Sequence, residues 1–592
     1  MNKNQRKILI LILLLFSLFI VISSSSAALS PGDSIKNKVN SSSSGATIEL
    51  AGGQIFKLKS SELNMLINKQ ITIKSNSSKN AIINLQDNGR AFNITGNGKL
   101  TLINITITNG AMGKGNGGAI YNNGSLSLTG CVFTKNIAKN GGAIYNDGSV
   151  TLTNCRFANN RAYYKNASYD LWDDSVVDEG IGGAIYNKGS LTLTNCTFTN
   201  NRASFIYLSE DNILFDRGLG GAIYNKGTNT LNSCIFTSNN AHYGGAIYNK
   251  ASTILTGCTF TSNTATIFND KASLTAKKCV FTKNTDSVIY NSNRSKTTLT
   301  DCIFLENKAT SFGAAIDNNE GSVSLTGCTF TKNTAENGGA IHNLGSVSVT
   351  ASLTAKNCVF TRNTATTGGA IFNDMGRTTL TGCSFTKNIA KYEGGGAIRN
   401  WAKLTLTQCT FIDNKAIEGG AILNEMAKTT LTAKDSLFIR NTAKKGGAIY
   451  NDRKGKATLN NCTFTKNTVT TFYKAGGTLT TKNCIFTDST LKYPLKLPDL
   501  VITKVKKTND IYKVTIKNKG EATAKKSLFS LSCSCKIKKT FGVKELAIGK
   551  SVVINLKFPS QHKKHSKSLH INYNKKIKES NYKNNIFRIG KI

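Results

Sequence analysis

The sequence predicts an all-β protein built as a right-handed parallel β-helix, and two repeated motifs and the composition lead to this prediction. The hexapeptide Gly-Gly-Ala-Ile-Tyr-Asn is spelled out in full six times, beginning at residues 117, 141, 182, 220, 244 and 446. A second motif, Cys-x-Phe-x-x-Asn, alternates with it. The chain has 592 residues with 52 Gly and only 4 Pro, a composition that suits strands and tight turns.

The second motif marks fourteen units, thirteen with cysteine in the first position and one with Ser436, and the last unit, at Cys484, lacks the Asn. Most spacings fall between 21 and 30 residues. Such a period is typical of a solenoid, in which each unit buries its apolar face only by stacking on a neighbour. The cysteines are Cys131, Cys155, Cys196, Cys234, Cys258, Cys279, Cys302, Cys328, Cys358, Cys383, Cys409, Cys462 and Cys484.

One unit, residues 189–201, shows two of its strands in the segment GSLTLTNCTFTNN. Leu191 and Leu193 alternate with Thr, the pattern of a strand with one buried face. Cys196 and Phe198 also alternate, but with opposite parity, so the chain must bend between the two pairs. The residue before each cysteine is usually Gly, Asn or Asp, which tolerate a left-handed backbone, and the bend is therefore expected there.

The hexapeptide is expected to form the third strand of each coil. Its Ile is constant, whereas the next position holds Tyr121, His342 or Arg399 in different units. A position that accepts such different side chains is expected to face outward, with Ile120 facing the core. Three short strands per coil, stacked about 4.8 Å apart, describe a pectate-lyase-like parallel β-helix. Residues from about 46 to 109 repeat the strand pattern without cysteine and are expected to begin the rod.

The repeated Asn and Cys residues have structural interpretations. Two Asn per unit, such as Asn136 and Asn146, stand at strand ends, where stacked amides are expected to hydrogen-bond along the rod. Stacked coils would bring cysteine Cα atoms within disulfide range. However, Ile105 and Ser436 fill the same slot in other coils, which favours a ladder of buried free thiols. No CxxC or paired His accompanies the cysteines, which argues against a metal site.

The N-terminus has the pattern of a secretory signal. Lys3, Arg6 and Lys7 precede the apolar run Ile8 to Ile22, and small residues follow with a cleavage site near Ala28. The run is shorter than the roughly 20 residues that a membrane span needs. We therefore predict a secreted or cell-surface protein that meets a membrane only through this segment.

The charge is strongly basic and unevenly distributed. The formal net charge is +42, and residues 492–592 hold 25 Lys and Arg against 5 Asp and Glu. A basic tail usually suggests nucleic acid, but export argues against that partner. An anionic wall polymer or acidic polysaccharide is expected instead. The predicted domains are a signal peptide over 1–28, a β-helix with an N-terminal cap over 29–490, and a basic β-sandwich over 498–592.

Two spacings break the repeat period. Cys155 and Cys196 are 41 residues apart, and Cys196 and Cys234 are 38 apart. Both excess segments, residues 162–181 and 203–220, lie between the cysteine motif and the hexapeptide. Because adjacent coils carry them at the same corner, we expect the two insertions to project side by side.

The two insertions predict an acidic, aromatic lobe. Aromatic faces with carboxylates suit sugar rings or a protein partner, and loops on rigid scaffolds tend to carry function. The oxygen cluster would suit Ca²⁺, and no other cofactor, metal ligand or catalytic residue is predicted. The alternative is a loop pair with its own apolar cluster and a solvated acidic rim. The candidate ligand-binding residues are Tyr163, Tyr164, Tyr169, Asp170, Trp172, Asp173, Asp174, Asp178, Tyr207, Asp211, Phe215 and Asp216.

The alternation of GGAI with FxxN resembles the polymorphic outer-membrane protein repeat, in the form found in adhesin-like surface proteins of methanogenic archaea. The resemblance covers about residues 46–488 and implies a cell-surface adhesin. The same fold carries pectate lyases and polygalacturonases, so the fold alone does not settle function. The segments LPDLVITKV, YKVTIKNKGEATA, IGKSVVINLKF and KESNYKNN, from Pro498 on, resemble a CARDB module, an immunoglobulin-like β-sandwich of cell-surface proteins.

These observations together predict a non-catalytic, adhesin-like protein of archaeal type. Its rod would display loops that bind glycans or surface proteins of the cell wall or of a host or partner cell. One alternative is a carbohydrate-active β-helix enzyme, a polysaccharide lyase or glycosidase with the lobe as its site. The other is a structural cell-wall protein that binds through its basic end.

Overall fold

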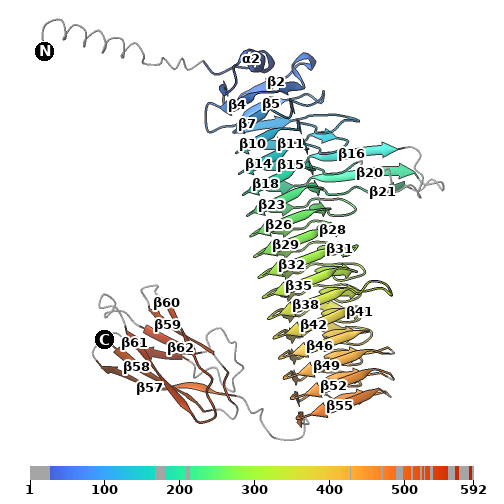
Figure 1. The fold of residues 1–592 in the computed structure, drawn as a ribbon, viewed down its shortest axis with the longest axis vertical. Helices are drawn as coiled ribbons and strands as arrows, with labels where there is room; N and C mark the ends of the chain where they lie inside the picture. Colours follow the sequence, from blue (N-terminus) through green and yellow to red (C-terminus); the bar gives the residue numbers. More distant parts are fainter. Residues whose placement is uncertain are drawn as a thin grey trace, which may run out of the picture. The chain divides into compact units, whose positions relative to one another are not determined.

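Each coil forms three short strands because its apolar residues alternate in three short runs separated by turn residues. In the computed structural model the strands stack coil upon coil into three parallel ladders (Figure 1), which hold 17, 17 and 16 strands within the described residues. The predicted right-handed parallel β-helix is confirmed. The structure describes residues 27–592 except 167–179, 209–213, 427, 453, 469–470, 476, 488–497, 509–510, 520–522, 526, 534–537, 558–566, 572–585 and 590–592.

The first ladder holds the Leu-Thr strands of the repeat, paired in register from coil to coil. Its strands are β1 (Ala46–Leu50), β4 (Gln70–Ser75), β7 (Lys99–Ile103), β10 (Ser125–Thr129), β14 (Ser149–Thr153), β18 (Ser190–Thr194), β23 (Thr228–Asn232), β26 (Ser252–Thr256), β29 (Ser273–Lys277), β32 (Lys296–Thr300), β35 (Ser322–Thr326), β38 (Ser352–Lys356), β42 (Arg377–Thr381), β46 (Lys403–Thr407), β49 (Thr430–Lys434), β52 (Lys456–Asn460) and β55 (Thr478–Lys482).

The second ladder holds the Cys-x-Phe strands, whose Phe rings stack 4.9 Å apart at Phe133 and Phe157. Its strands are β2 (Ile55–Lys57), β5 (Ala81–Asn84), β8 (Ile105–Thr108), β11 (Val132–Thr134), β15 (Arg156–Ala158), β19 (Thr197–Thr199), β24 (Ile235–Thr237), β27 (Thr259–Thr261), β30 (Val280–Thr282), β33 (Ile303–Leu305), β36 (Thr329–Thr331), β39 (Val359–Thr361), β43 (Ser384–Thr386), β47 (Thr410–Ile412), β50 (Leu437–Ile439), β53 (Thr463–Thr465) and β56 (Ile485–Thr487).

The third ladder holds the hexapeptide strands, whose Ile is buried in each coil from Ile120 to Ile449, while Met65, Phe92 and Phe472 take its place in the coils at the ends. Its strands are β3 (Met65–Ile67), β6 (Phe92–Ile94), β9 (Ile120–Asn122), β13 (Ile144–Asn146), β17 (Ile185–Asn187), β22 (Ile223–Asn225), β25 (Ile247–Asn249), β28 (Ile267–Asp270), β31 (Ile289–Ser292), β34 (Ile316–Asn319), β37 (Ile341–Leu344), β41 (Ile371–Asp374), β45 (Ile398–Asn400), β48 (Ile422–Asn424), β51 (Ile449–Asn451) and β54 (Phe472–Lys474).

The corners between strands use left-handed backbone conformations. Asn154 and Asp301, each the residue before a cysteine, have φ of 55° and 54°, which confirms the predicted bend. A second left-handed corner lies one residue before each Asn of the cysteine motif, as at Lys135 with φ 56°. The first glycine of the hexapeptide is also left-handed, whereas the second has no room for a side chain. A methyl group added at Gly221 would collide with the carbonyl oxygens of Gly245 and Asn240.

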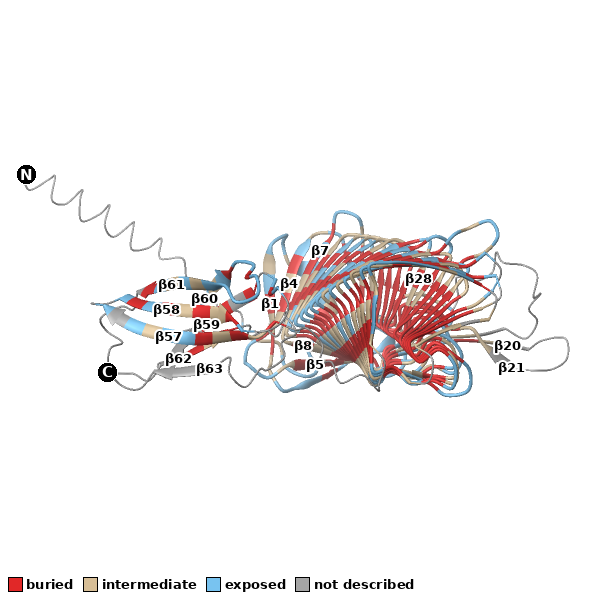
Figure 2. Ribbon diagram, turned by 90° about the horizontal axis from the view of Figure 1, so that it is seen from below, coloured by how far each residue is buried: buried red, intermediate tan, exposed pale blue. Residues whose placement is uncertain are grey.

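The interior is filled by rows of equivalent buried side chains. Figure 2, a ribbon coloured by burial, shows buried residues along the stacked strands. The predicted Asn ladders are confirmed: Asn284 Nδ2 donates to Phe260 O and to Asn307 Oδ1, both at 3.0 Å. The cysteines stack in the predicted slot and are buried, except Cys484 near the end of the row, which is partly exposed; that they are free thiols stays a prediction. Ile105 and Ser436 occupy the same slot and are buried.

The prediction about the fifth position of the hexapeptide needs correction. These side chains lie outside the coil core, but many of them are covered rather than exposed. Tyr145, Tyr186 and Tyr224 are at most 5% exposed, and Ile181 and Leu219 pack against them in a separate apolar cluster. The flanking loops, whose contribution the motif alone does not show, cover this face.

Two further parts complete the chain. Helix α2 (Ile35–Ser41) and the 3₁₀ turn η1 (Ser60–Glu62) stand at the N-terminal end of the rod, where Ile35 and Val39 join its core. Contacts divide the chain into Met1–Asp488 and Ser489–Ile592. The second unit has two antiparallel sheets: β57 (Leu500–Thr508), β58 (Ile511–Asn518) and β61 (Ser551–Lys557), then β60 (Lys538–Val543), β59 (Ser527–Cys533), β62 (Lys567–Ile571) and β63 (Ile586–Ile589). This arrangement is consistent with an immunoglobulin-like module.

Candidate functional site

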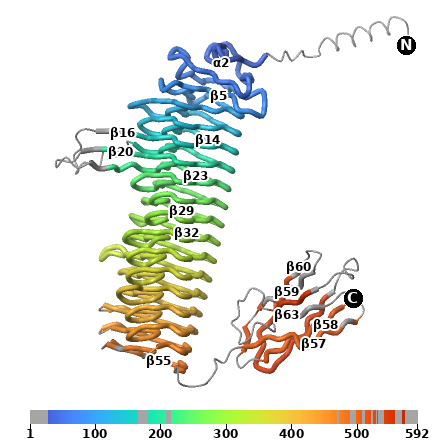
Figure 3. Tube along the Cα trace, turned by 180° about the vertical axis from the view of Figure 1, so that it is seen from behind, coloured from blue at the N-terminus to red at the C-terminus, as the bar shows by residue number. Residues whose placement is uncertain are grey.

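The two insertions build a small sheet at one edge of the rod. Strand β16 (Arg161–Asn166) pairs in parallel with β20 (Arg202–Leu208), which turns back through the antiparallel strand β21 (Leu214–Asp216). The short strand β12 (Ile137–Ala138) completes this four-stranded sheet. Figures 1 and 3 both show β16 and β20 extending away from the stacked coils. The described strands of the two insertions therefore lie side by side, as their common position in the repeat predicts.

Aromatic residues at the base of this sheet are packed against cations. Phe205 is buried and stacks on Tyr164 with ring centroids 6.1 Å apart. Lys139 Nζ lies 5.0 Å from the Tyr164 ring centroid, and Arg161 Cζ lies 4.1 Å from that of Tyr163. Such cation–π contacts fix ring orientation at sites that remain partly accessible. Both tyrosines are half-buried and lie at the base of the projecting sheet.

Asp216 braces the hairpin from within. Its carboxylate accepts hydrogen bonds from Ser204 Oγ at 2.9 Å, Phe205 N at 3.0 Å and Gly218 N at 3.1 Å. Arg202 Nη2 donates to the same carboxylate at 3.2 Å. With four internal donors, Asp216 positions β20 against β21 and has little capacity left for an external ligand.

The structure does not describe the side chains of the remaining candidate residues. For Tyr207 and Phe215 the structure describes the backbone only. Tyr169, Asp170, Trp172, Asp173, Asp174, Asp178 and Asp211 lie outside the described residues. The acidic part of the lobe and its Ca²⁺ therefore stay predictions. In the described part of the chain, no three His, Cys, Asp or Glu side chains are grouped as a metal site, and no helix is long and apolar enough to cross a membrane.

A His–Asp pair is buried on the outer side of the third ladder. His342 Nδ1 lies 2.9 Å from Asp317 Oδ1 on the neighbouring coil, and His342 Nε2 lies 3.8 Å from Asp374 Oδ2. Phe312 stacks over the imidazole at 4.6 Å. Burial by itself lowers the pKa of His342, but the hydrogen bond to Asp317 and the charges of both carboxylates outweigh burial and raise the pKa above its usual value.

Arg399, two coils beyond His342, contacts two carboxylates. Arg399 contacts Glu393 through Nη1 and Glu425 through Nη2, the latter at 2.8 Å. Trp401 Nε1 also donates to Glu425 at 3.0 Å, and the guanidinium carbon lies 4.4 Å from the Trp401 ring centroid. Glu393 remains 50% exposed, so this cluster reaches the surface. It joins two carboxylates, a cation and an aromatic ring, the elements from which sugar-binding and sugar-cleaving sites are made.

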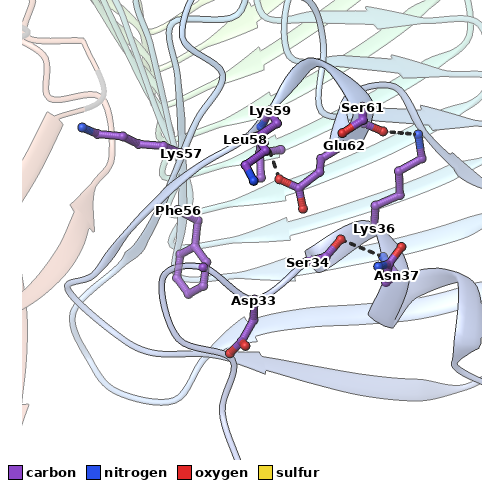
Figure 4. Close-up of a pocket in the computed structure, with 11 residues that line it drawn as sticks. Asp33, Ser34, Lys36, Asn37, Phe56, Lys57, Leu58, Lys59, Ser61 and Glu62 are labelled. Atoms are coloured by element: carbon purple, nitrogen blue, oxygen red, sulfur yellow. Dashed lines mark hydrogen bonds between the residues drawn. The ribbon is translucent and has the colours of Figure 1, made fainter.

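A pocket of about 410 Å³ lies at the N-terminal cap, between α2, β2 and η1 (Figure 4). Its polar groups are engaged in holding the cap together. Lys36 Nζ donates to Ser61 O at 2.7 Å, and Lys59 N donates to the Glu62 carboxylate at 3.2 Å. Ser34 Oγ accepts from Asn37 N at the start of the helix. These contacts indicate a structural pocket that closes the end of the rod.

Comparison with protein families supports the fold directly. The right-handed β-helix region family matches residues 21–218, 210–355 and 346–491, most of the chain. This protein belongs to that family. The CARDB family matches residues 497–588 of the β-helix protein, so a CARDB domain follows the rod. No curated protein matches the sequence. The archaeal origin stays a prediction.

Two solved structures resemble the β-helix protein at low sequence identity. One is a mannuronic-acid-specific polysaccharide family 6 lyase from human gut microbiota, with 13% identity, a TM-score of 0.30, and coverage of 65% of this chain and 86% of that one. The other is an Acinetobacter baumannii bacteriophage tailspike protein, a capsular polysaccharide depolymerase, with 9% identity, a TM-score of 0.16, and coverage of 92% and 76%. Both are polysaccharide-degrading enzymes. This finding contradicts the prediction that the protein is not an enzyme, and that prediction is withdrawn.

Sequence reasoning missed both clusters on the outer side of the third ladder. The signal for them was present, because the fifth hexapeptide letter changes from Tyr to Asp317, His342 and Arg399 in the later coils. In the sequence alone, these changes indicate only an outward position. Their meaning depends on partners such as Glu393 and Glu425, which lie in loops of variable length.

Proposed function

We propose that this β-helix protein is an exported, adhesin-like cell-surface protein that binds a glycan of a cell wall or of a partner cell. The observation that carries the proposal is the projecting sheet built by the two insertions, with half-buried Tyr163 and Tyr164 at its root. A stacked solenoid is a rigid support. A ligand-binding projection on such a support is held at a fixed place and orientation.

The test compares glycan and cell binding by the full chain with that of a variant altered in the parts of the two insertions that lie outside the described strands. Residues 167–179 and 209–213 are replaced by Gly and Ser of equal length, which keeps β16, β20, β21 and the Asp216 brace. We expect binding to a glycan panel and to partner cells to fall at least tenfold. A matched control replaces residues 346–350, a loop on another coil, in the same way. Equal binding by both variants and the unaltered protein would reject the projection as the binding site.

A second candidate function, cleavage of the bound polysaccharide, is favoured by the Arg399 cluster. Glu393 and Glu425 both contact the Arg399 guanidinium, and a pair of carboxylates is what glycoside hydrolases use for cleavage. Release of new sugar ends from acidic polysaccharides, lost in Glu425→Gln, would establish it. Activity that survives both Glu393→Gln and Glu425→Gln would exclude this pair.

A further inference from the structure

The edge that carries the insertions continues down the rod as a groove. β40 (Thr364–Ala365) pairs with β44 (Ile389–Ala390), and single bridges then join Ile389 to Lys415 and Lys415 to Thr442. The groove spans these coils and has a volume of about 620 Å³. Its lining residues are Ile389, Ala390, Lys391, Lys415, Ala416, Ile417, Thr442, Ala443, Lys444 and Thr468.

The groove combines an apolar floor with a cationic rim. The floor repeats one buried alanine per coil, at Ala390, Ala416 and Ala443. The rim consists of exposed lysines from the same coils, Lys391, Lys415 and Lys444. Lys415 precedes its floor alanine and pairs with Ile389 and Thr442, whereas Lys391 and Lys444 follow their alanines two coils apart, so the positive charges lie on both sides of the floor. Tyr392, which follows Lys391, is 71% exposed and offers an aromatic face beside the rim.

The rim lysines keep their charge available. Nearby carboxylates are already occupied by other cations: Glu393 and Glu425 contact Arg399, and Glu418 contacts Lys445 at 3.2 Å. Within the described residues, none of the three rim lysines forms an ion pair. The groove is therefore a positively charged surface with no internal counter-ion among those residues.

The backbone of the groove is closed to an added peptide strand. Lys391 N donates to Ala365 O, Ala390 N to Lys415 O, and Ala416 N to Thr442 O. Lys444 N donates to Ile417 O, and Ala443 N to Thr468 Oγ1. An acidic peptide that binds by strand addition needs free backbone donors, and these are used. Side-chain ammonium groups and apolar surface remain available to a ligand.

We propose that this groove binds a linear anionic polysaccharide, whose acidic groups pair with Lys391, Lys415 and Lys444 while its sugar rings lie on the alanine floor and against Tyr392. The three lysines come from three adjacent coils and lie on both sides of the alanine floor, so acidic groups along an extended sugar chain in the groove can pair with them. Repeated weak contacts of this kind add up along a polymer. The inference rests on the proposed function, glycan binding, and names its ligand class and a second site for it.

The test measures binding of the full chain to polygalacturonate, dextran sulfate, neutral dextran and poly-glutamate at low salt. The variant carries Lys391→Glu, Lys415→Glu and Lys444→Glu. The control, Lys277→Glu, Lys356→Glu and Lys434→Glu, makes the same charge change at exposed lysines of the first ladder. We expect the unaltered protein to bind polygalacturonate or dextran sulfate and not dextran. The groove variant should bind at least tenfold more weakly, and the control within about twofold.

If the charge-reversed variant fails to fold, a neutral variant with Gln at the three groove positions replaces it in the test. We expect this neutral variant to lose binding to the anionic polysaccharide as well, but by a smaller factor. Equal losses in groove and control variants would show attraction by net charge alone and overturn the inference. Stronger binding to poly-glutamate than to both anionic polysaccharides would overturn it as well. Anionic polysaccharide binding that depends on residues 167–179 and 209–213 but not on the groove would reject the groove and keep the proposed function. Absence of all glycan binding would reject both.

Discussion

At the scale of single residues, the rod depends on buried polar groups that satisfy one another from coil to coil. Asn284 shows the pattern: its Oδ1 accepts from the backbone N–H and the side-chain amide of Asn263 in the preceding coil, and its Nδ2 donates to Phe260 O of that same coil. The buried turn backbone thereby loses no hydrogen bond on leaving water. Because no other side chain presents a donor and an acceptor in this geometry, the repeat keeps Asn.

Replacing a ladder Asn is expected to destabilise the rod strongly. Asn284→Ala leaves Asn263 N and Phe260 O buried without partners, and each such group costs about 1–3 kcal/mol. The unfolding midpoint in urea should fall clearly. Asn240→Ala, at an exposed edge position, is the control and should change stability by less than about 0.5 kcal/mol. A midpoint unchanged in the first variant would contradict the structural role of the ladder.

The thiol ladder is expected to be unreactive in the folded protein. Burial raises the pKa of Cys462 to about 11, so its thiol stays protonated and poorly nucleophilic at neutral pH. Maleimide labelling followed by mass spectrometry should modify Cys484, the partly exposed member, before Cys462. Urea should make the whole ladder reactive. Ladder peptides linked by disulfides in the untreated protein would contradict this prediction.

His342 makes stability depend on pH. Its pKa is raised in the folded state by Asp317 and Asp374, so the protonated form stabilises the fold. That contribution is complete below the unfolded pKa of about 6.5 and is lost as pH rises through the higher folded value. We therefore expect the unaltered protein to melt at a higher temperature than His342→Asn, with the largest difference near pH 5.5 and a smaller one toward pH 9. A difference that grows with pH would have the wrong sign.

At the scale of the elements, the strands follow directly from the sequence, but the loops that cover the outer face of the third ladder do not. Alternation at Leu191 and Leu193, the shift of parity at Cys196, and the bend before it together give two strands and a corner. The burial of Tyr186 was not predicted, because Ile181 and Leu219 reach it from segments outside the repeat. Likewise, Glu393 lies in the loop before the strand that holds Arg399, and the repeat pattern does not predict their contact.

The second glycine of the hexapeptide is expected to be indispensable to coil stacking. Gly221→Ala places a methyl group against backbone oxygens of the next coil, which cannot move independently, and should cost at least about 1–3 kcal/mol. Gly257→Asn is a matched control, since Asn154 and Asn195 occupy the equivalent corner in other coils with φ near 55°. Limited proteolysis should cut the first variant faster and leave the second unchanged. Equal resistance of both would show that the close contact is not needed.

At the scale of the whole molecule, positive charge is found in two places, and the proposals give each its own role: ligand binding on the rod and wall attachment in the C-terminal domain. The rod carries a groove with local positive charge, and residues 492–592 carry a net charge of +20. Charge of this density attracts anionic polymers with a strength that falls with ionic strength. The family match shows a CARDB domain here but says nothing of attachment, so the anionic wall polymer remains a proposed partner of this domain.

Removal of the CARDB domain should separate attachment from recognition. A chain ending at Asp488 keeps the whole β-helix unit and loses the basic domain. We expect it to be released from anionic cell-wall material at about 50 mM salt, where the full chain is retained, while its binding to the soluble glycan ligand stays within about twofold. At about 500 mM salt, with a Debye length of only a few Å, the full chain should be released as well. Wall retention by the truncated chain, or salt-independent retention by the full chain, would place attachment elsewhere than in this basic domain.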